Sequence, residues 1–230
     1  MRYKLAEILI NNEGQQCKKI LSTSVGHGLL RKSLMDSMGI KRVNAFLFHY
    51  GWSLGASDAE EAIKNHKGSS IEDLLKAARP LHIRTGQITG GESERYFELD
   101  EDQNIVAFRA SGKWYDSFEA AEFIKHYGRA KEPVCHTITG YASGYISTVG
   151  RRLVIAIETH CVAKGDPECR YEMRLLEDWG DEAQEILQFY NRQHILDELE
   201  YTYEQLLEQR NYIAKVSTYH KKLTELLSNG

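Results

Sequence analysis

The chain has 230 residues, a formal net charge of −4 at pH 7, a hydrophobic fraction of 42% and a charged fraction of 27%. These values are typical of a globular protein with a sizeable core, and the acidic balance argues against a chain that itself wraps nucleic acid. No apolar run reaches the roughly 20 residues of a transmembrane helix, and the first residues lack a signal-peptide pattern. We therefore expect a cytoplasmic protein with no membrane contact.

The first 79 residues are expected to be mostly helical. Residues 8–21 suggest a short strand or helix, and residues 23–28 indicate a break. Helices are predicted over 29–39 and 43–66. The segment 69–73 resembles a capping box, which would begin another helix.

Residues 80–180 carry a mixture of strand and helix patterns. The predicted strands cover 81–89, 105–110, 153–157 and 169–174, with a turn signal at 100–104. The predicted helices cover 117–128 and 137–149. Gly140, Gly144 and Gly150 fit neither the spacing of a dinucleotide fingerprint nor that of a phosphate loop. Close helix packing is therefore the favoured role of these glycines.

Residues 182–227 contain neither proline nor glycine. Apolar residues recur there at steps of mostly three, four or seven, and glutamate and lysine fill much of the remainder. This pattern is typical of an amphipathic helix that ends in a coiled coil.

A cluster of cysteines is the most informative feature of the second half. Three of the four cysteines in the chain take part, namely Cys135, Cys161 and Cys169. Thiolates with a nearby carboxylate such as Glu158 can bind zinc tetrahedrally, and a reducing compartment favours metal over disulfides. The spacing alone leaves the fourth ligand open, because His136 and His160 compete with Glu158. It also allows the cysteines to be simple buried apolar residues.

Several segments resemble a known family. They are residues 30–34, 39–59, 114–120, 133–135, 140–152, 158–161 and 165–169. Together they are similar to the sensory region of bacterial XylR/DmpR-type activators of aromatic catabolism, in which an XylR N-terminal domain precedes a 4-vinyl reductase domain. The resemblance covers nearly the whole chain and is most specific between Cys135 and Cys169.

The resemblance implies an α+β sensor in three parts. Residues 1–79 would form a helical dimerisation part, residues 80–180 a mixed α/β domain that binds ligand and zinc, and residues 181–230 a helical linker. The homodimer would bind a small aromatic effector and signal to an output domain that this chain does not contain. No phosphate-loop motif or basic recognition helix is present, so neither ATPase activity nor DNA contact is expected of these residues.

The resemblance also implies site residues. The structural zinc would be held by Cys135, Glu158, Cys161 and Cys169. The candidate ligand-binding residues are Trp114, Thr89, His82, Phe108, Tyr141, Tyr145 and Ala156. Trp114 offers an aromatic wall and is favoured as a pocket residue over a core residue, whereas Tyr141 and Tyr145 could equally fill the core.

The same resemblance suggests that the effector is not simple phenol. Phenol-responsive relatives carry a hydrogen-bonding histidine at a position that corresponds here to Thr89. Two bulky pocket aromatics of those relatives are replaced near Gly112 and Ala156. We therefore expect a wider pocket and an effector that is larger or less polar than phenol.

Two alternatives remain open at the level of sequence. The first is an enzyme of the 4-vinyl reductase or tetrapyrrole type, which an open metal position or a bound chromophore would favour. The second is a scaffold that only oligomerises through its long helix, which a filled or closed pocket would favour.

Overall fold

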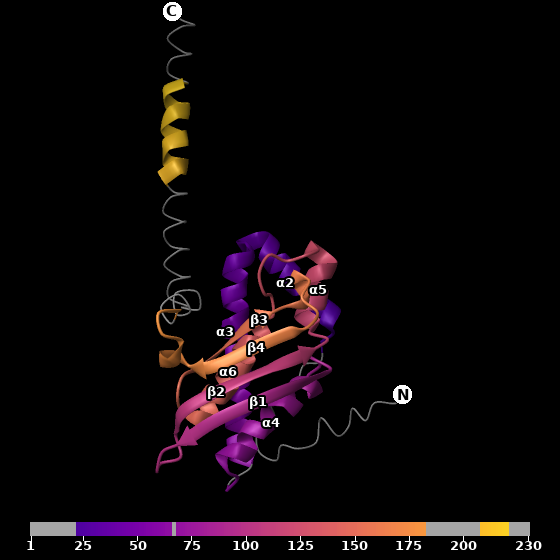
Figure 1. Ribbon diagram of the computed structural model, residues 1–230. Coiled ribbons are helices and arrows are strands. Elements are labelled where there is room, and N and C mark those ends of the chain that lie inside the picture. Colours follow the sequence, from indigo (N-terminus) through magenta and orange to yellow (C-terminus); the bar gives the residue numbers. More distant parts are fainter. Residues whose placement is uncertain (1–21, 66–67, 183–207, 221–230) are drawn as a thin grey trace, which may run out of the picture.

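The structure is a computed structural model that describes residues 22–65, 68–182 and 208–220 (Figure 1). The helices are α2 (Ser24–Met38), α3 (Ile40–Asn65), α4 (Ile71–Arg84), α5 (Phe118–Tyr127) and α6 (His136–Gly150). The strands are β1 (Gly90–Leu99), β2 (Ile105–Tyr115), β3 (Val154–His160) and β4 (Cys169–Leu175), and the short turns are η1 (Val162–Lys164) and η2 (Leu176–Trp179). Residues 208–220 are helical as well. The expected α+β class is confirmed.

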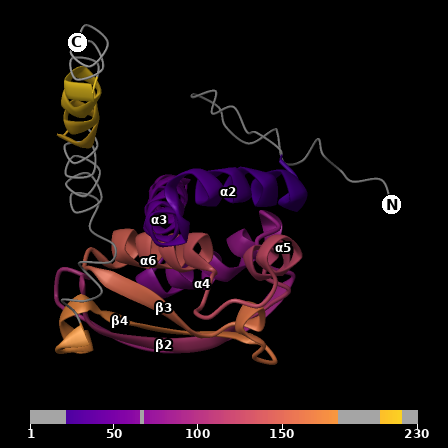
Figure 2. The ribbon, with the colours of Figure 1, turned by 90° about the horizontal axis from the view of Figure 1, so that it is seen from above.

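The four strands form one antiparallel sheet in the order β1-β2-β4-β3. Figure 2 shows α4, α5 and α6 lying over one face of this sheet, with α2 and α3 in a further layer above α6. Along β4 the inward residues Cys169, Tyr171 and Met173 are buried, while the residues between them are more exposed. This alternation is the pattern of a sheet with one covered face and one face towards solvent.

Helices α3 and α6 approach each other unusually closely, and glycines on both helices make this possible. A Cβ atom at Gly51 would lie 2.1 Å from the carbonyl oxygen of Thr137, and one at Gly55 would lie 2.1 Å from that of Tyr141. From the other side, Cβ atoms at Gly140 and Gly144 would lie 2.0 and 2.2 Å from the carbonyl oxygens of Phe48 and Trp52. The packing role expected for Gly140 and Gly144 is thus confirmed.

A buried ion pair connects α2 to the start of α6. Arg31 on α2 donates from Nη1 to Glu119 Oε1 at 3.2 Å and from Nη2 to the carbonyl of Val134 at 2.7 Å. Glu119 in turn accepts the amides of Thr137 and Ile138 at 3.1 and 3.0 Å. Since both charges are buried and well hydrogen-bonded, removal of one leaves the other without compensation.

We expect Glu119→Gln to lower the free energy of unfolding by about 3 kcal/mol, because Arg31 would remain buried without its counter-charge. Urea denaturation followed by circular dichroism measures this loss. Glu72→Gln is the matched control, because Glu72 pairs with Lys76 on the exposed surface of α4 and should contribute less than about 0.5 kcal/mol. If the two variants lose the same free energy of unfolding, the buried ion pair contributes no more to stability than the exposed one, and the prediction is wrong.

The strand predicted at 81–89 is wrong. Helix α4 continues to Arg84, and the chain then turns before β1. The alternation of Leu81 and Ile83 resembled a strand, but Leu81 also continues the helical stripe that begins at Leu74. Proline has no N–H group, so the carbonyl four residues before Pro80 lacks its helical hydrogen-bond partner. Pro80 is exposed, so water can bind this carbonyl instead.

Two other local predictions need correction. The break expected at 23–28 is the first turn of α2, where the side chain of Thr23 caps the helix by accepting the amide of Gly26 at 3.0 Å. Strand β1 was not predicted, because its inward residues include Gly91, Ser93 and Arg95 instead of an apolar series. The remaining strands and helices agree with the predictions, and β2 extends further, to Tyr115.

Part of the sequence lies outside the described residues. The element expected at 8–21 and most of the helix expected at 182–227 fall there, so these predictions stay untested. Within the described part of the latter, residues 208–220 are helical and exposed. Among the residues that the structure describes, no helix is long and apolar enough to cross a membrane.

Candidate metal centre and ligand pocket

Four separate points of the chain bring the predicted metal ligands together. Cys135 precedes the first residue of α6, Glu158 lies on β3, Cys161 follows β3, and Cys169 begins β4. The pairing of β3 with β4 shifts between Glu158 and His160. Such an irregularity re-aims side chains, and it leaves Glu158 and Cys161 buried while His160 is exposed.

The ligand atoms of these four residues all lie within 4.8 Å of one another, and all four residues are buried. Cys135 Sγ and Cys169 Sγ are 3.9 Å apart, and all three cysteines are free. Glu158 Oε2 accepts the amides of Val134 and Cys135 at 3.1 and 2.9 Å, whereas Glu158 Oε1 is buried without a hydrogen-bond partner within the described part of the chain. A buried oxygen of this kind suits a bound cation.

The electrostatics of the cluster also fit a cation. Burial, reinforced by the nearby Cys161, raises the pKa of Glu158 to about 8, and burial raises the pKa of Cys135 as well. A divalent metal reverses this preference, because it stabilises the thiolate and carboxylate forms. The cluster could therefore hold a metal ion with Glu158, and not His136 or His160, as the fourth ligand.

A cavity of about 50 Å³, partly open to solvent, lies between the sheet and helices α4 and α6. Its apolar walls come from Leu75 on α4, Ile146 on α6, and Phe108 and Trp114 on β2. His82, Tyr171 and the arginines at positions 79 and 95 add polar groups. The lining thus combines aromatic walls with a few convergent polar groups, as small-molecule sites do.

Aromatic rings form part of the cavity wall. Trp114 and Tyr171 stack with their ring centroids 4.4 Å apart and an interplanar angle of 17°. His82 is buried, its Nδ1 lies 3.1 Å from Gln87 Oε1, and burial lowers the pKa of its imidazole to about 4. The pocket therefore contains a neutral imidazole, which comes from His82. Thr89, the position that corresponds to the histidine of phenol-responsive relatives, does not line the cavity.

Tyr171 fills space beside Gly112, one of the positions at which a wider pocket was expected. A Cβ atom at Gly112 would lie 2.6 Å from the hydroxyl oxygen of Tyr171, so the tyrosine occupies the space that a larger residue at position 112 would take. Tyr171 was missed by sequence analysis. The only available signal was its place on a buried strand, and its pairing with Gly112 is a long-range contact.

Of the predicted ligand-binding residues, the structure brings Trp114, Phe108 and His82 together around the cavity. The other four do not line it. The hydroxyl of Thr89 donates to Asp116 at 2.7 Å, and that of Tyr141 donates to Asp58 at 2.6 Å. The Tyr145 hydroxyl donates to the carbonyl of Leu74 at 3.0 Å, and Ala156 is buried on β3. Tyr141 still contacts the pocket indirectly, since its ring centroid is 4.3 Å from that of His82.

Comparisons with known proteins agree with this architecture. Residues 8–95 match the family described as activator of aromatic catabolism, XylR_N, and residues 113–175 match the 4-vinyl reductase domain. The chain therefore carries an XylR-type N-terminal region followed by a 4-vinyl reductase domain, and it is homologous to the sensory regions of this class of regulator.

Two individual regulators and one solved sensory domain are similar to the chain. It is 32% identical over 172 residues to the phenol regulator MopR of Acinetobacter guillouiae, which covers 75% of this chain and 30% of that protein. It is 32% identical over 151 residues to the transcriptional regulatory protein XylR of Pseudomonas putida, covering 66% of this chain and 26% of that protein. The chain thus spans less than a third of these curated relatives. The crystal structure of the phenol-responsive sensory domain of the transcription activator PoxR with phenol is similar with a TM-score of 0.66 and 29% identity, covering 75% of this chain and 84% of that one.

Proposed function

We propose that this chain is the sensory region of a bacterial transcription activator and that it binds a small aromatic effector in the cavity beside Trp114. The observation that carries the proposal is the aromatic cavity between α4, α6 and the sheet, in a homologue of a sensory domain that was solved with phenol. Trp114 and Phe108 would contact the ring, and the imidazole of His82 would offer a polar contact. We assign no enzymatic activity to the chain.

The cavity must enlarge to admit an effector. A cavity that holds benzene measures about 150 Å³, which exceeds the volume of about 50 Å³ found here. Tyr171 is the side chain that would move, because it stacks on Trp114 along one wall. The ligand would then replace the Tyr171 ring against Trp114, and its differential affinity for the enlarged state would shift the population towards that state.

Zinc is the metal that we propose for the buried cluster. Three thiolates and one carboxylate make a closed tetrahedral set, so the four protein ligands leave no position for an activated water. The role of the metal would be structural, because it ties the start of α6 to the β3–β4 hairpin. This arrangement disfavours the enzyme alternative.

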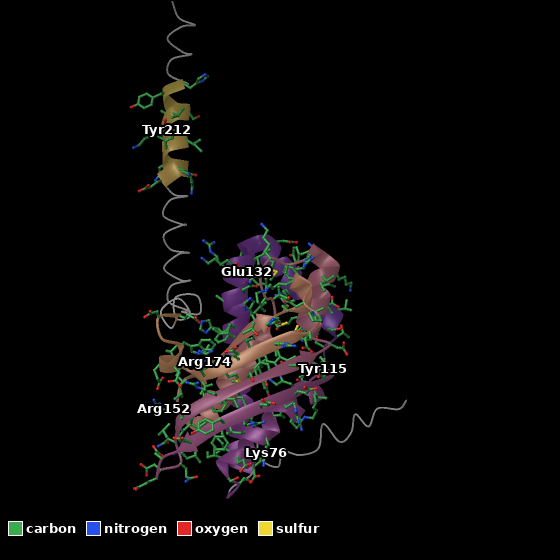
Figure 3. The ribbon with its side chains drawn as sticks, viewed as in Figure 1. Lys76, Tyr115, Glu132, Arg152, Arg174 and Tyr212 are labelled. Carbon is green, nitrogen blue, oxygen red and sulfur yellow. The ribbon has the colours of Figure 1, made fainter. Side chains whose placement is uncertain are left out.

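We further propose a homodimer that passes the signal to an output domain. Helices α2 and α3 form the layer farthest from the sheet (Figure 2) and carry several exposed large apolar side chains. They include Leu29, Leu30, Phe46, Tyr50 and Leu54. A patch of this kind suits a contact between two copies. The helix that contains residues 208–220, with exposed Tyr212 (Figure 3), Ile213 and Val216, would act as the linker.

Calorimetric titration with a panel of small aromatics tests the proposed site. We expect at least one aromatic to bind, and we expect Ala110→Phe to abolish that binding, because Ala110 lines the cavity and a phenyl group would fill it. Val106→Phe is the matched control, since Val106 lies on the same strand, is exposed and does not line the cavity. If no aromatic binds, the result favours the scaffold alternative. The small volume of the cavity also agrees with that alternative.

A further inference from the structure

An arginine on the covered face of the sheet is the feature that the proposed function leaves unused. Along β1, exposure alternates so that Ser93, Arg95 and Phe97 lie on the less exposed, inner face. Arg95 pairs in register with Ala110 on β2, and both residues line the cavity. A guanidinium placed under a helix is costly unless an anion or hydrogen-bond acceptors meet it.

A second arginine approaches the same cavity from the helix above. Arg79 on α4 donates from Nη1 to the carbonyl of Gly91 at 3.0 Å, which holds its guanidinium beside strand β1. A guanidinium has five N–H donors, so this single bond leaves most of them available. Arg79 and Arg95 thus both contribute to the lining of the one cavity.

Besides these two arginines, the charged residues of the lining are Lys113 and one carboxylate, Glu92. Lys113 is paired with Glu168 at 3.1 Å, and Glu92 accepts the hydroxyl of Tyr115, which is labelled in Figure 3. Within the ranges that the structure describes, neither Arg79 nor Arg95 forms an ion pair. With Lys113 paired to Glu168, two arginines face one carboxylate, so positive charge exceeds negative charge in the lining.

Tyr171 connects the aromatic wall with the two arginines. Tyr171 lines the cavity together with Arg79 and Arg95. Burial raises the pKa of Tyr171, whereas a hydrogen bond with Ser93 and then the positive charges of Arg95 and Arg79 act in the opposite direction. The Tyr171 ring is the one that stacks on Trp114. A ligand that takes the place of this ring would project its substituent towards the two arginines.

We infer that the effector is an aromatic carboxylate, whose ring lies against Trp114 and whose carboxylate binds between Arg95 and Arg79. Guanidinium matches a carboxylate in charge and in planar, bidentate geometry. The aromatic wall excludes water from one side of the contact and strengthens it. This inference rests on the proposed aromatic-binding function and names the chemical class of its ligand.

Titrations with benzoate, phenol and toluene test the inference. We expect benzoate to bind most tightly and to weaken as ionic strength rises. Arg95→Gln should reduce benzoate affinity by about 10- to 100-fold, the usual range for a hydrogen bond to a charged group, and it should leave the affinity for toluene unchanged. Arg79→Gln, on an exposed helix position where folding is not at risk, should weaken benzoate in the same direction.

Arg109→Gln is the matched control, because Arg109 is exposed on β2 and does not line the cavity. Thermal unfolding of each variant separates lost binding from lost folding. If phenol or toluene binds as tightly as benzoate and Arg95→Gln changes neither, the carboxylate inference is overturned while the aromatic-binding function stands. If no aromatic binds the unaltered chain, the proposed function itself fails.

Discussion

Cys161→Ala is expected to lose its bound metal and most of its folding free energy together. Cys161 is fully buried, and its sulfur belongs to the set of ligand atoms within 4.8 Å of one another. Formation of a structural zinc site is coupled to folding and supplies about 10 kcal/mol or more in small zinc domains. Because a whole domain is stable by only about 5–15 kcal/mol, the variant should be largely unfolded.

The measurement combines metal analysis with thermal unfolding of the purified protein. The unaltered chain should contain one zinc ion per chain and unfold cooperatively, while Cys161→Ala should show neither property. Cys17→Ala is the matched control, because Cys17 is the one cysteine of the sequence outside the cluster, and it should retain zinc. A Cys161→Ala protein that stays folded and keeps its zinc would show that the cluster is not a structural metal site.

The double variant Gly140→Ala/Gly144→Ala is expected to have the second largest effect, a loss of about 4 kcal/mol or more in the free energy of unfolding. Each added methyl group would meet a backbone carbonyl of α3, at 2.0 Å for Gly140 and 2.2 Å for Gly144. A backbone carbonyl cannot rotate away as a flexible side chain can, so the helices must separate. Separation would also open the contacts that Tyr141 and Tyr145 make in the core.

Urea denaturation gives this loss directly. Gly26→Ala is the control, because Gly26 also lies in a helix but its added methyl would meet only side-chain hydroxyls, at 3.2 and 3.3 Å. Its effect should stay within about 1 kcal/mol, the size of the helix-propensity difference between glycine and alanine. If the double variant is as stable as this control, the close approach of α3 and α6 is not required for folding.

The glycines show how far local sequence information reaches. The spacing of Gly140 and Gly144 excluded the known phosphate-binding patterns, and close packing followed from that exclusion. The partner helix could not be predicted, because Gly51 and Gly55 are distant in sequence. Strand β1 was missed for a related reason, since an inner face with Ser93 and Arg95 does not give the apolar alternation by which strands are recognised.

The candidate site was predictable to different degrees in its two parts. The family resemblance named the four candidate metal ligands, and the irregularity between Glu158 and His160 explains why the carboxylate and not that histidine is buried with the thiols. The pocket was only partly predictable. Trp114 and His82 were expected, but Tyr171 and Arg95 reach the cavity through strand pairing across the sheet, which no local pattern encodes.

A crystal structure of the chain with its tightest-binding aromatic tests the central claim most directly. We expect the ring of the ligand in the cavity between α4, α6 and β2, against Trp114, with Tyr171 displaced from its stacked position. If the aromatic lies elsewhere on the protein, and the cavity beside Trp114 stays filled by Tyr171, the assignment of this cavity as the effector site is contradicted.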